Sequence, residues 1–220
     1  MITLGGAGPI KDFYRGGFQE IDQVSIFEKV SKATFRPTSA SQYPQVISHA
    51  FRISTSGRPG PVYIDCNEDV LYEKINEKDS SLATRSEQSS GPSGDNDLIK
   101  KTIDLLSNAN SPIVFAGGGT FWSDASEELN EFIDNSGIPF YTTPMSRGVV
   151  SDNHQYSFPA ARSSAFRETD LVIVLGTRFN WIMTYGNRIN PEAKIIQVDI
   201  LEEEIAHNRN VSLGIVGDCK

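Results

Sequence analysis

The stretch Asp170-Leu-Val-Ile-Val-Leu-Gly-Thr-Arg-Phe-Asn-Trp181 decides the fold class of this 220-residue chain. Its apolar run, Leu171 to Leu175, is too short for an independent helix and too uniformly apolar for a half-exposed strand. Such a run predicts a strand that is buried on both faces of a parallel sheet. Gly176 ends the strand and Arg178 follows it. Because ligands bind at the carboxyl ends of strands in open parallel sheets, Arg178 is a candidate ligand-binding residue; a solvated arginine in an ordinary loop is the alternative.

The composition is that of a globular protein, with 38% hydrophobic and 22% charged residues. A net charge of -8 argues against nucleic acid or an anionic membrane as partner. No apolar run approaches the roughly 20 residues that cross a bilayer, so we expect no membrane insertion. Cys66 and Cys219 lie far apart and form no CxxC, which favours reduced thiols in an intracellular protein. The three histidines show no ligand spacing, so we expect no metal site.

The first part of the chain predicts a small α/β unit that ends in a polar linker. The expected elements are a strand at Met1 to Leu4, helices at Gly16 to Val30 and Ser39 to Ser54, and a strand at Val62 to Asp65 after the rigid turn Gly57-Arg-Pro-Gly-Pro61. Residues 72–97 are rich in Ser, Glu, Asp and Lys, which is typical of a linker. We therefore place domain boundaries after residues 71 and 97.

Beyond the linker, strands and helices alternate regularly. The expected strands are Pro112 to Ala116, Ile138 to Tyr141, Leu171 to Leu175, Lys194 to Asp199 and Val211 to Val216, and the expected helices are Asp97 to Ser107, Ser123 to Asn135, Pro159 to Glu168 and Glu202 to Asn208. This alternation predicts a doubly wound parallel sheet of the α/β class. Right-handed crossovers would place the loops after the strands on one common edge.

Three glycines, Gly117 to Gly119, lie between an expected strand and an expected helix, where backbone amides often hold phosphates. Gly117 and Gly119 match the dinucleotide motif GxGxxG, but its sixth position is Trp122, which is too large for close packing of helix on strand. The next strand lacks an acid for a nicotinamide ribose, so the sequence disfavours NAD. A nucleotide in another orientation and a simple tight turn both remain open.

Asp199 ends the expected strand that begins at Lys194. An acid in this position can accept hydrogen bonds from ribose hydroxyls, or it can cap the helix expected to follow. Arg178 can pair bidentately with a phosphate. The glycines, Arg178 and Asp199 on one edge together suggest a site for an adenine nucleotide. Phe18-Gln19-Glu20 is a second candidate, because side chains at a helix start can point into a cleft, although helix capping is the simpler interpretation.

With these motifs in view, the chain resembles the thiamine-diphosphate enzymes related to acetolactate synthase. Residues 1–71 resemble the C-terminal part of the family's pyrimidine-binding domain, and residues 98–220 its central Rossmann-like domain. The segments that carry the resemblance to the first are Gly17-Phe-Gln-Glu20, Asp22-Gln23, Gly57 to Asp65 and Asp69-Val70. The segments most similar to the branch of 2-hydroxyacyl-CoA lyases and oxalyl-CoA decarboxylases are Thr143 to Val150, Asp152-Asn-His154, Ala160-Ala-Arg162 and Gly176 to Trp181.

The resemblance implies roles for particular residues. Phe18 and Gln19 would line the active site and face the thiazolium of the neighbouring subunit. The oxalyl-CoA branch more usually has Tyr-Glu at this pair, so Phe-Gln favours the lyase. The central domain of relatives holds FAD or ADP as a non-redox nucleotide. The positions that match those contacts are Gly118, Gly119, Arg178, Asp199, Ile200, Asp218 and Cys219.

The same resemblance implies a carbon–carbon lyase that uses thiamine diphosphate and Mg²⁺ on an acyl-CoA substrate, as a homodimer or homotetramer in peroxisomes or cytoplasm. The family's catalytic glutamate would lie upstream of Met1, and Gly217-Asp218-Cys219 is not its magnesium-binding GDG motif. We therefore expect a fragment that is inactive alone. The alternatives are an oxalyl-CoA decarboxylase, an acetolactate synthase-like enzyme with bound FAD, and a non-catalytic module that binds an adenine nucleotide.

Overall fold

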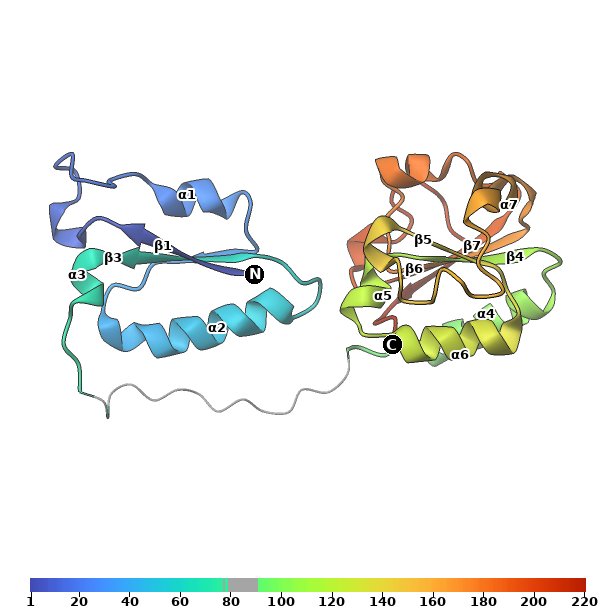
Figure 1. Cartoon of the computed structure of the whole chain (residues 1–220), viewed down its shortest axis with the longest axis horizontal. Helices are drawn as coiled ribbons and strands as arrows, with labels where there is room; N and C mark the ends of the chain where they lie inside the picture. The colour runs from blue at the N-terminus through green and yellow to red at the C-terminus, as the bar shows by residue number, and fades with distance from the viewer. Residues whose placement is uncertain (77, 79–90) are drawn as a thin grey trace. The chain divides into compact units, whose positions relative to one another are not determined.

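The computed structural model describes residues 1–76, 78 and 91–220. The chain forms two compact units, Met1–Gln88 and Ser89–Lys220 (Figure 1). Each unit contains a parallel sheet with flanking helices, which confirms the predicted α/β class. Much of the predicted linker, namely residues 77 and 79–90, lies outside the described residues.

Unit 1 is built on a three-stranded parallel sheet in the order β1-β3-β2. Its strands are β1 Ile2–Ala7, β2 Ala33–Phe35 and β3 Val62–Asn67, and its helices are η1 Ile10–Asp12, α1 Gln23–Glu28, η2 Ala40–Gln42, α2 Tyr43–Thr55 and α3 Glu68–Leu71. Helices α1 and α2 lie on opposite faces of this sheet (Figure 1). A core of Ala50, Val62, Ile64 and Cys66 joins α2 to β3.

The helix predicted from Gly16 to Val30 is wrong over its first half. Residues 13–22 form a loop, and α1 begins only at Gln23. The carboxylate of Glu20 accepts hydrogen bonds from the backbone N–H groups of Gly17 and Tyr14, and these bonds hold the loop in place of a helical turn. Strand β1 is longer than predicted, because Gly5 pairs with β3 and leaves the space that the Tyr63 ring fills. The short β2 was not predicted.

Unit 2 is built on a five-stranded parallel sheet in the order β5-β4-β6-β7-β8. Its strands are β4 Pro112–Ala116, β5 Phe140–Thr142, β6 Leu171–Leu175, β7 Lys194–Asp199 and β8 Leu213–Val216, and its helices are α4 Asn96–Ser107, α5 Gly118–Trp122, α6 Ser126–Ser136, η4 Pro144–Ser146, η5 Pro159–Ala161, α7 Arg162–Glu168, η6 Trp181–Gly186 and η7 Glu202–Glu204. Strand β6 lies at the centre, as its uniformly apolar run predicts.

Both faces of this sheet are covered, so it is doubly wound. On one face, α4 and α6 contribute side chains such as Leu105 and Ile133 to a core with β4 and β6. On the other face, Phe166 of α7 packs with Phe179 and Met183. Figure 1 shows α4 and α6 on one side of the strands and α7 on the other. Within the described residues, no helix is both long enough and apolar enough to cross a bilayer.

Two local predictions in unit 2 need correction. The helix expected from Glu202 to Asn208 is only the three-residue η7, because Ala206 and Asn208 adopt φ angles of 60° and 70°. The short helix α5 begins within the glycine run at Gly118 and was not predicted, while the helix expected from Ser123 to Asn135 corresponds to α6 and begins at Ser126. The strand order reverses direction between β4 and β6, and in sheets of this type a crevice is expected at that position.

Candidate functional site

The residues predicted to bind a nucleotide lie on one edge of the unit 2 sheet. Hydrogen bonds join the loops that follow neighbouring strands: Gly119 N–H donates to Gly176 O at 2.8 Å, and Gly176 N–H donates to Val198 O at 2.8 Å. The loop after β8 joins the same row, because Gly217 N–H donates to Asp199 O at 3.0 Å. The topology therefore brings these loops together as the sequence predicts, while their role in binding stays a prediction.

The glycines at this edge are required by packing between the loops. A Cβ atom on Gly119 would lie 2.5 Å from the Cα of Gly176, and one on Gly117 would overlap Thr177. The amides of Gly117 and Gly119 already donate to Leu175 O and Gly176 O. These two N–H groups are thus not available for a phosphate, and α5 has only five residues. The tight-turn interpretation explains the glycines without a ligand.

Arg178 has an acidic neighbour in the structure. Its Nη1 lies 3.6 Å from Oε1 of Glu204, a buried carboxylate, while about half of the Arg178 side chain remains exposed. The buried Gln197 side chain donates to Glu204 O at 2.9 Å and accepts from Ala206 N at 2.9 Å. Arg178 therefore neutralises the charge of Glu204, and only the exposed half of the Arg178 side chain is available to a ligand.

The ends of β7 and β8 form an acidic corner. Asp199 is buried, and its Oδ1 accepts from Leu201 N at 3.0 Å, so it caps a turn and not the helix that was expected. The Asp218 side chain fills the space beside Gly91. Burial, and then the charges of Asp218 and Asp199, raise the pKa of the Cys219 thiol to about 12. This corner can accept hydrogen bonds from hydroxyl groups, but its charge disfavours phosphates.

In unit 1, Phe18 and Gln19 lie in the loop that folds over the end of β1. A Cβ on Gly8 would lie 2.8 Å from Phe18 O, and one on Gly6 would lie 4.0 Å from Gln19 Oε1. Gln19 has a φ of 59°, and Phe18 is 87% exposed. Hydrogen bonds from Gly17 and Tyr14 lower the pKa of Glu20 and keep it ionised in its loop-holding role.

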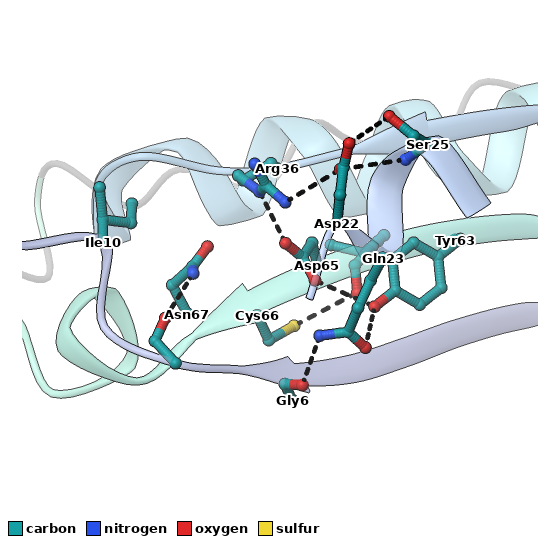
Figure 2. A network of polar contacts seen from close by, with 12 residues as sticks. Gly6, Ile10, Asp22, Gln23, Ser25, Arg36, Tyr63, Asp65, Cys66 and Asn67 are labelled. Atoms are coloured by element: carbon teal, nitrogen blue, oxygen red, sulfur yellow. Dashed lines mark hydrogen bonds and ion pairs between the residues drawn. The ribbon is translucent and has the colours of Figure 1, made fainter. Parts of the chain in front are cut away.

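A polar network that the sequence analysis missed lies beside this loop (Figure 2). Asp65 on β3 is fully buried, accepts from Arg36 Nε at 2.6 Å and accepts from the Tyr63 hydroxyl at 2.9 Å. Gln23 accepts from the same hydroxyl at 3.0 Å and donates to Gly6 O at 2.9 Å. Burial, followed by Asp65, raises the pKa of Tyr63. The signal that could have revealed this network was the carboxylate that directly follows Val62-Tyr-Ile64 at the start of β3.

One buried acceptor at the strand ends of unit 1 has no partner among the described residues. Asn67 Nδ2 donates to Gly8 O at 2.6 Å, but Asn67 Oδ1 makes no hydrogen bond, although the residue is fully buried. With the exposed Phe18 ring and Gln19 amide, this edge fits contacts to one face of an organic cofactor. Within residues 1–76, 78 and 91–220, no group of three or more His, Cys, Asp or Glu side chains is placed to hold a metal ion.

Comparison with known proteins identifies the family. Residues 99–220 match the central domain of thiamine pyrophosphate enzymes. The whole chain is 35% identical to a 2-hydroxyacyl-CoA lyase of Arabidopsis thaliana, of which it covers 40%. It is also 35% identical over 99% of its length to an oxalyl-CoA decarboxylase of Escherichia coli, covering 40% of that protein. A probable acetolactate synthase large subunit of Methanococcus aeolicus is 34% identical over the whole chain, which covers 39% of it.

The chain thus spans about 40% of the length of each of these relatives. The match to the central domain accounts for nearly all of unit 2, including the strand-end edge. Together with the doubly wound sheet, it confirms the family that the sequence motifs indicated: the chain belongs to the thiamine pyrophosphate enzyme family and carries its central domain in residues 99–220.

Proposed function

We propose that this chain is part of a thiamine-diphosphate-dependent 2-hydroxyacyl-CoA lyase, which cleaves a 2-hydroxyacyl-CoA to an aldehyde and formyl-CoA. The observation that carries the proposal is the 35% identity to plant 2-hydroxyacyl-CoA lyases over the whole chain. The oxalyl-CoA decarboxylase of Escherichia coli is equally similar, so identity alone does not separate the two reactions. The Phe18-Gln19 pair favours the lyase, since the decarboxylase branch more usually has Tyr-Glu there.

Residues 1–71 would then be the C-terminal part of a pyrimidine-binding domain. Bound thiamine diphosphate supplies the nucleophilic carbon for carbon–carbon cleavage, and the protein supplies binding and orientation. The exposed ring of Phe18 would cover apolar surface of the cofactor and exclude water from it. The Gln19 amide would orient a polar group by hydrogen bonding. In the proposed homodimer or homotetramer, both side chains would face the cofactor of the neighbouring subunit.

The decisive test is an exchange of segments. The segment of the Arabidopsis thaliana lyase that aligns with this chain would be replaced by the chain, and the chimera assayed with thiamine diphosphate and Mg²⁺. We expect release of aldehyde and formyl-CoA from a 2-hydroxyacyl-CoA and little turnover of oxalyl-CoA. Preference for oxalyl-CoA would favour the decarboxylase. A folded chimera that turns over neither substrate, while the parent enzyme is active, would contradict the proposal.

We further infer that the strand-end edge of unit 2 contacts an adenine nucleotide. The support is the convergence of Gly118, Gly119 and Arg178 with Asp199, Ile200, Asp218 and Cys219 on one edge of a sheet of the nucleotide-binding type. Because Gly119 N–H is engaged and Asp199 and Asp218 are acidic, ribose hydroxyls fit the β7 and β8 ends better than phosphates do. The phosphates would contact the exposed half of Arg178.

Isothermal titration with ADP, CoA and FAD tests this inference, with Arg178→Ala as the variant and Lys194→Ala, at an exposed cation at the amino end of β7, as the control. Saturable binding of ADP or CoA that weakens only in Arg178→Ala would support it and the acyl-CoA branch. Tight binding of FAD would instead favour an acetolactate synthase-like enzyme. Binding of ADP together with an inactive chimera would favour a non-catalytic nucleotide module. Absence of binding to the folded chain would contradict a site made by unit 2 alone.

A further inference from the structure

A shallow pocket of about 520 Å³ lies on the α7 side of unit 2, apart from the residues discussed so far. It is formed by α7 and by the segment that leads into β7. Its lining residues are Ser163, Arg167, Asn187, Arg188, Ile189, Asn190 and Pro191. Arg167 lies shortly before β6, and Pro191 shortly before β7. The pocket is therefore nearer the amino ends of these strands, whereas the nucleotide-site candidates follow the carboxyl ends.

The pocket has two arginines in its lining and a third beside it, yet no carboxylate neutralises them. Within the described part of the chain, no acidic oxygen lies within 4.0 Å of the guanidinium groups of Arg162, Arg167 or Arg188. Arg167 makes one hydrogen bond, from Nη2 to Ser164 Oγ at 3.2 Å. These three arginines thus have no acidic partner among the described residues, although the chain has 28 acidic side chains and only 20 basic ones.

Arg162 is held in place by contacts that leave its charge unpaired. Its guanidinium lies 4.9 Å from the ring centre of Phe115 and 5.5 Å from that of Phe166, and both rings are buried. Burial, and then the positive charge of Arg188, lower the pKa of Arg162. Arg188 is thus close enough to repel Arg162, and an anion between or beside them would remove that repulsion.

The opposite wall of the pocket is rigid. Asn190 N–H donates to Phe166 O at 2.8 Å, and Asn190 Nδ2 donates to Thr169 O at 3.0 Å. These two bonds hold residues 187–191 against α7 and against Thr169, the residue that follows it. Arg209 Nη2 donates to Asn190 O at 3.1 Å from the other side. Ile189 is buried in the core beneath. A preformed wall of this kind lowers the entropy cost of binding.

We propose that this pocket, between α7 and residues 187–191, binds a phosphate group through Arg167 and Arg188, with Arg162 as a fixed cation behind them. Guanidinium groups pair with phosphate oxygens through two parallel N–H···O bonds, which makes arginine the preferred side chain for this anion. The phosphate belongs either to free inorganic phosphate or to a phosphate ester such as that of coenzyme A. The site does not depend on the proposed lyase activity, because it uses none of the residues assigned to that activity.

The test uses the 220-residue chain and inorganic phosphate as the probe, titrated by calorimetry at fixed ionic strength against a chloride control. The variant is Arg167→Gln/Arg188→Gln; both side chains are exposed, so the fold should persist. The matched control is Arg147→Gln/Arg52→Gln, which removes the same charge at exposed arginines that do not line the pocket. We expect saturable binding to the wild type and the control, and at least tenfold weaker binding to the variant.

No saturable binding to the wild-type chain would overturn the proposal. Equal weakening in the variant and the control would also overturn it, since it would show a response to net charge alone. The source of the phosphate follows from a second pair of titrations, with coenzyme A and dephospho-coenzyme A. If the two substitutions weaken the binding of coenzyme A but not of dephospho-coenzyme A, the pocket holds the 3′-phosphate of coenzyme A. If they weaken the binding of inorganic phosphate and of neither cofactor, the pocket is an independent phosphate site. A lyase-inactive chimera would leave each of these results unchanged.

Discussion

Gly119 and Gly176 pack against each other so closely that the Cβ position of Gly119 lies 2.5 Å from the Cα of Gly176. The contact joins the loop after β4 to the loop after β6, at the position where the strand order reverses. Gly119 N–H also donates to Gly176 O at 2.8 Å. Loop packing at the switch point therefore accounts for a glycine that resembles part of a dinucleotide motif.

Gly119→Ala should destabilise unit 2 by about 1–3 kcal/mol, because the new methyl group meets backbone that cannot move aside. Gly118→Ala is the matched control in the same helix, since its Cβ would meet only the flexible side chain of Met145, at 3.0 Å. Urea unfolding followed by the fluorescence of Trp122 and Trp181 measures both variants. Equal stability of the two variants would contradict the packing explanation.

Arg36→Met should destabilise unit 1 by about 3–5 kcal/mol, since it leaves the fully buried Asp65 carboxylate without its cation. Arg15→Met, at an exposed ion pair with Asp12, should cost less than about 1 kcal/mol. Both tryptophans lie in unit 2, so their fluorescence does not report on unit 1. Hydrogen exchange of the β3 amides measures the stability of unit 1 instead. Restored protection in Arg36→Met/Asp65→Leu would show that the unpaired charge caused the loss.

Asp170 should make unit 2 sensitive to acid. Hydrogen bonds from the amides of Asn110, at 2.6 Å, and Ser111, at 3.0 Å, hold the pKa of Asp170 below its usual value. A folded-state pKa that is lowered stabilises the fold above the unfolded pKa of about 3.9, and that stability is lost as pH falls through the lower folded value.

Asp170→Asn should therefore lower the free energy of unfolding by about 1–2 kcal/mol at neutral pH and have a smaller effect below the folded-state pKa. Urea midpoints measured by tryptophan fluorescence between about pH 7 and pH 2.5 span the range of the unperturbed pKa, about 3.9. Asp104→Asn, on the exposed face of α4, is the control. A constant difference between wild type and Asp170→Asn across this range would exclude the predicted linkage.

Cys219 should react slowly with thiol reagents in the native state. Burial and the carboxylates of Asp218 and Asp199 raise its pKa to about 12, so the reactive thiolate is scarce near neutral pH. Cys66 is buried. A colorimetric thiol assay at about pH 8, below the ordinary thiol pKa of about 8.5, should titrate both groups promptly only after addition of denaturant. Asp218→Asn should speed the reaction of Cys219 in the folded chain. Cys219→Ser identifies which part of the signal belongs to Cys219. Rapid reaction of Cys219 in the folded wild-type chain would contradict the prediction.

Phe18→Tyr/Gln19→Glu should change the substrate preference of the lyase chimera toward oxalyl-CoA. Both side chains are exposed at the end of β1, so the exchange should leave the fold intact. The measurement is the ratio of kcat/KM for a 2-hydroxyacyl-CoA to kcat/KM for oxalyl-CoA, and we expect that ratio to fall at least tenfold, equivalent to about 1.4 kcal/mol. Tyr14→Phe, at a neighbouring exposed loop position, serves as control. An unchanged ratio would remove the argument that this pair favours the lyase.

The sequence predicted all five strands of the unit 2 sheet, although β5 and β8 begin two residues later than expected. Strands β4, β6 and β7 begin and end where their apolar runs predict, because burial on both faces of a parallel sheet demands such runs. The sequence did not predict the loop at residues 13–22. There the Glu20 carboxylate accepts hydrogen bonds from backbone amides, and this loop replaces the first half of the expected helix. That competition depends on the exact local geometry, which hydrophobic periodicity does not record.

The candidate site also combines features that the sequence predicts with features that only the structure shows. The sequence by itself determined that the strand-end loops share one edge, because the order of strands and helices along the chain was enough. The roles of Phe18 and Gln19 come from the resemblance alone and remain predictions. Only the tertiary structure decided that Gly119 packs on Gly176, that Arg36 neutralises Asp65, and that Arg167 and Arg188 share a pocket that no carboxylate among the described residues lines. Each of these relationships joins side chains from different elements, and distances between elements are set by packing of the core, which no local pattern in a sequence encodes.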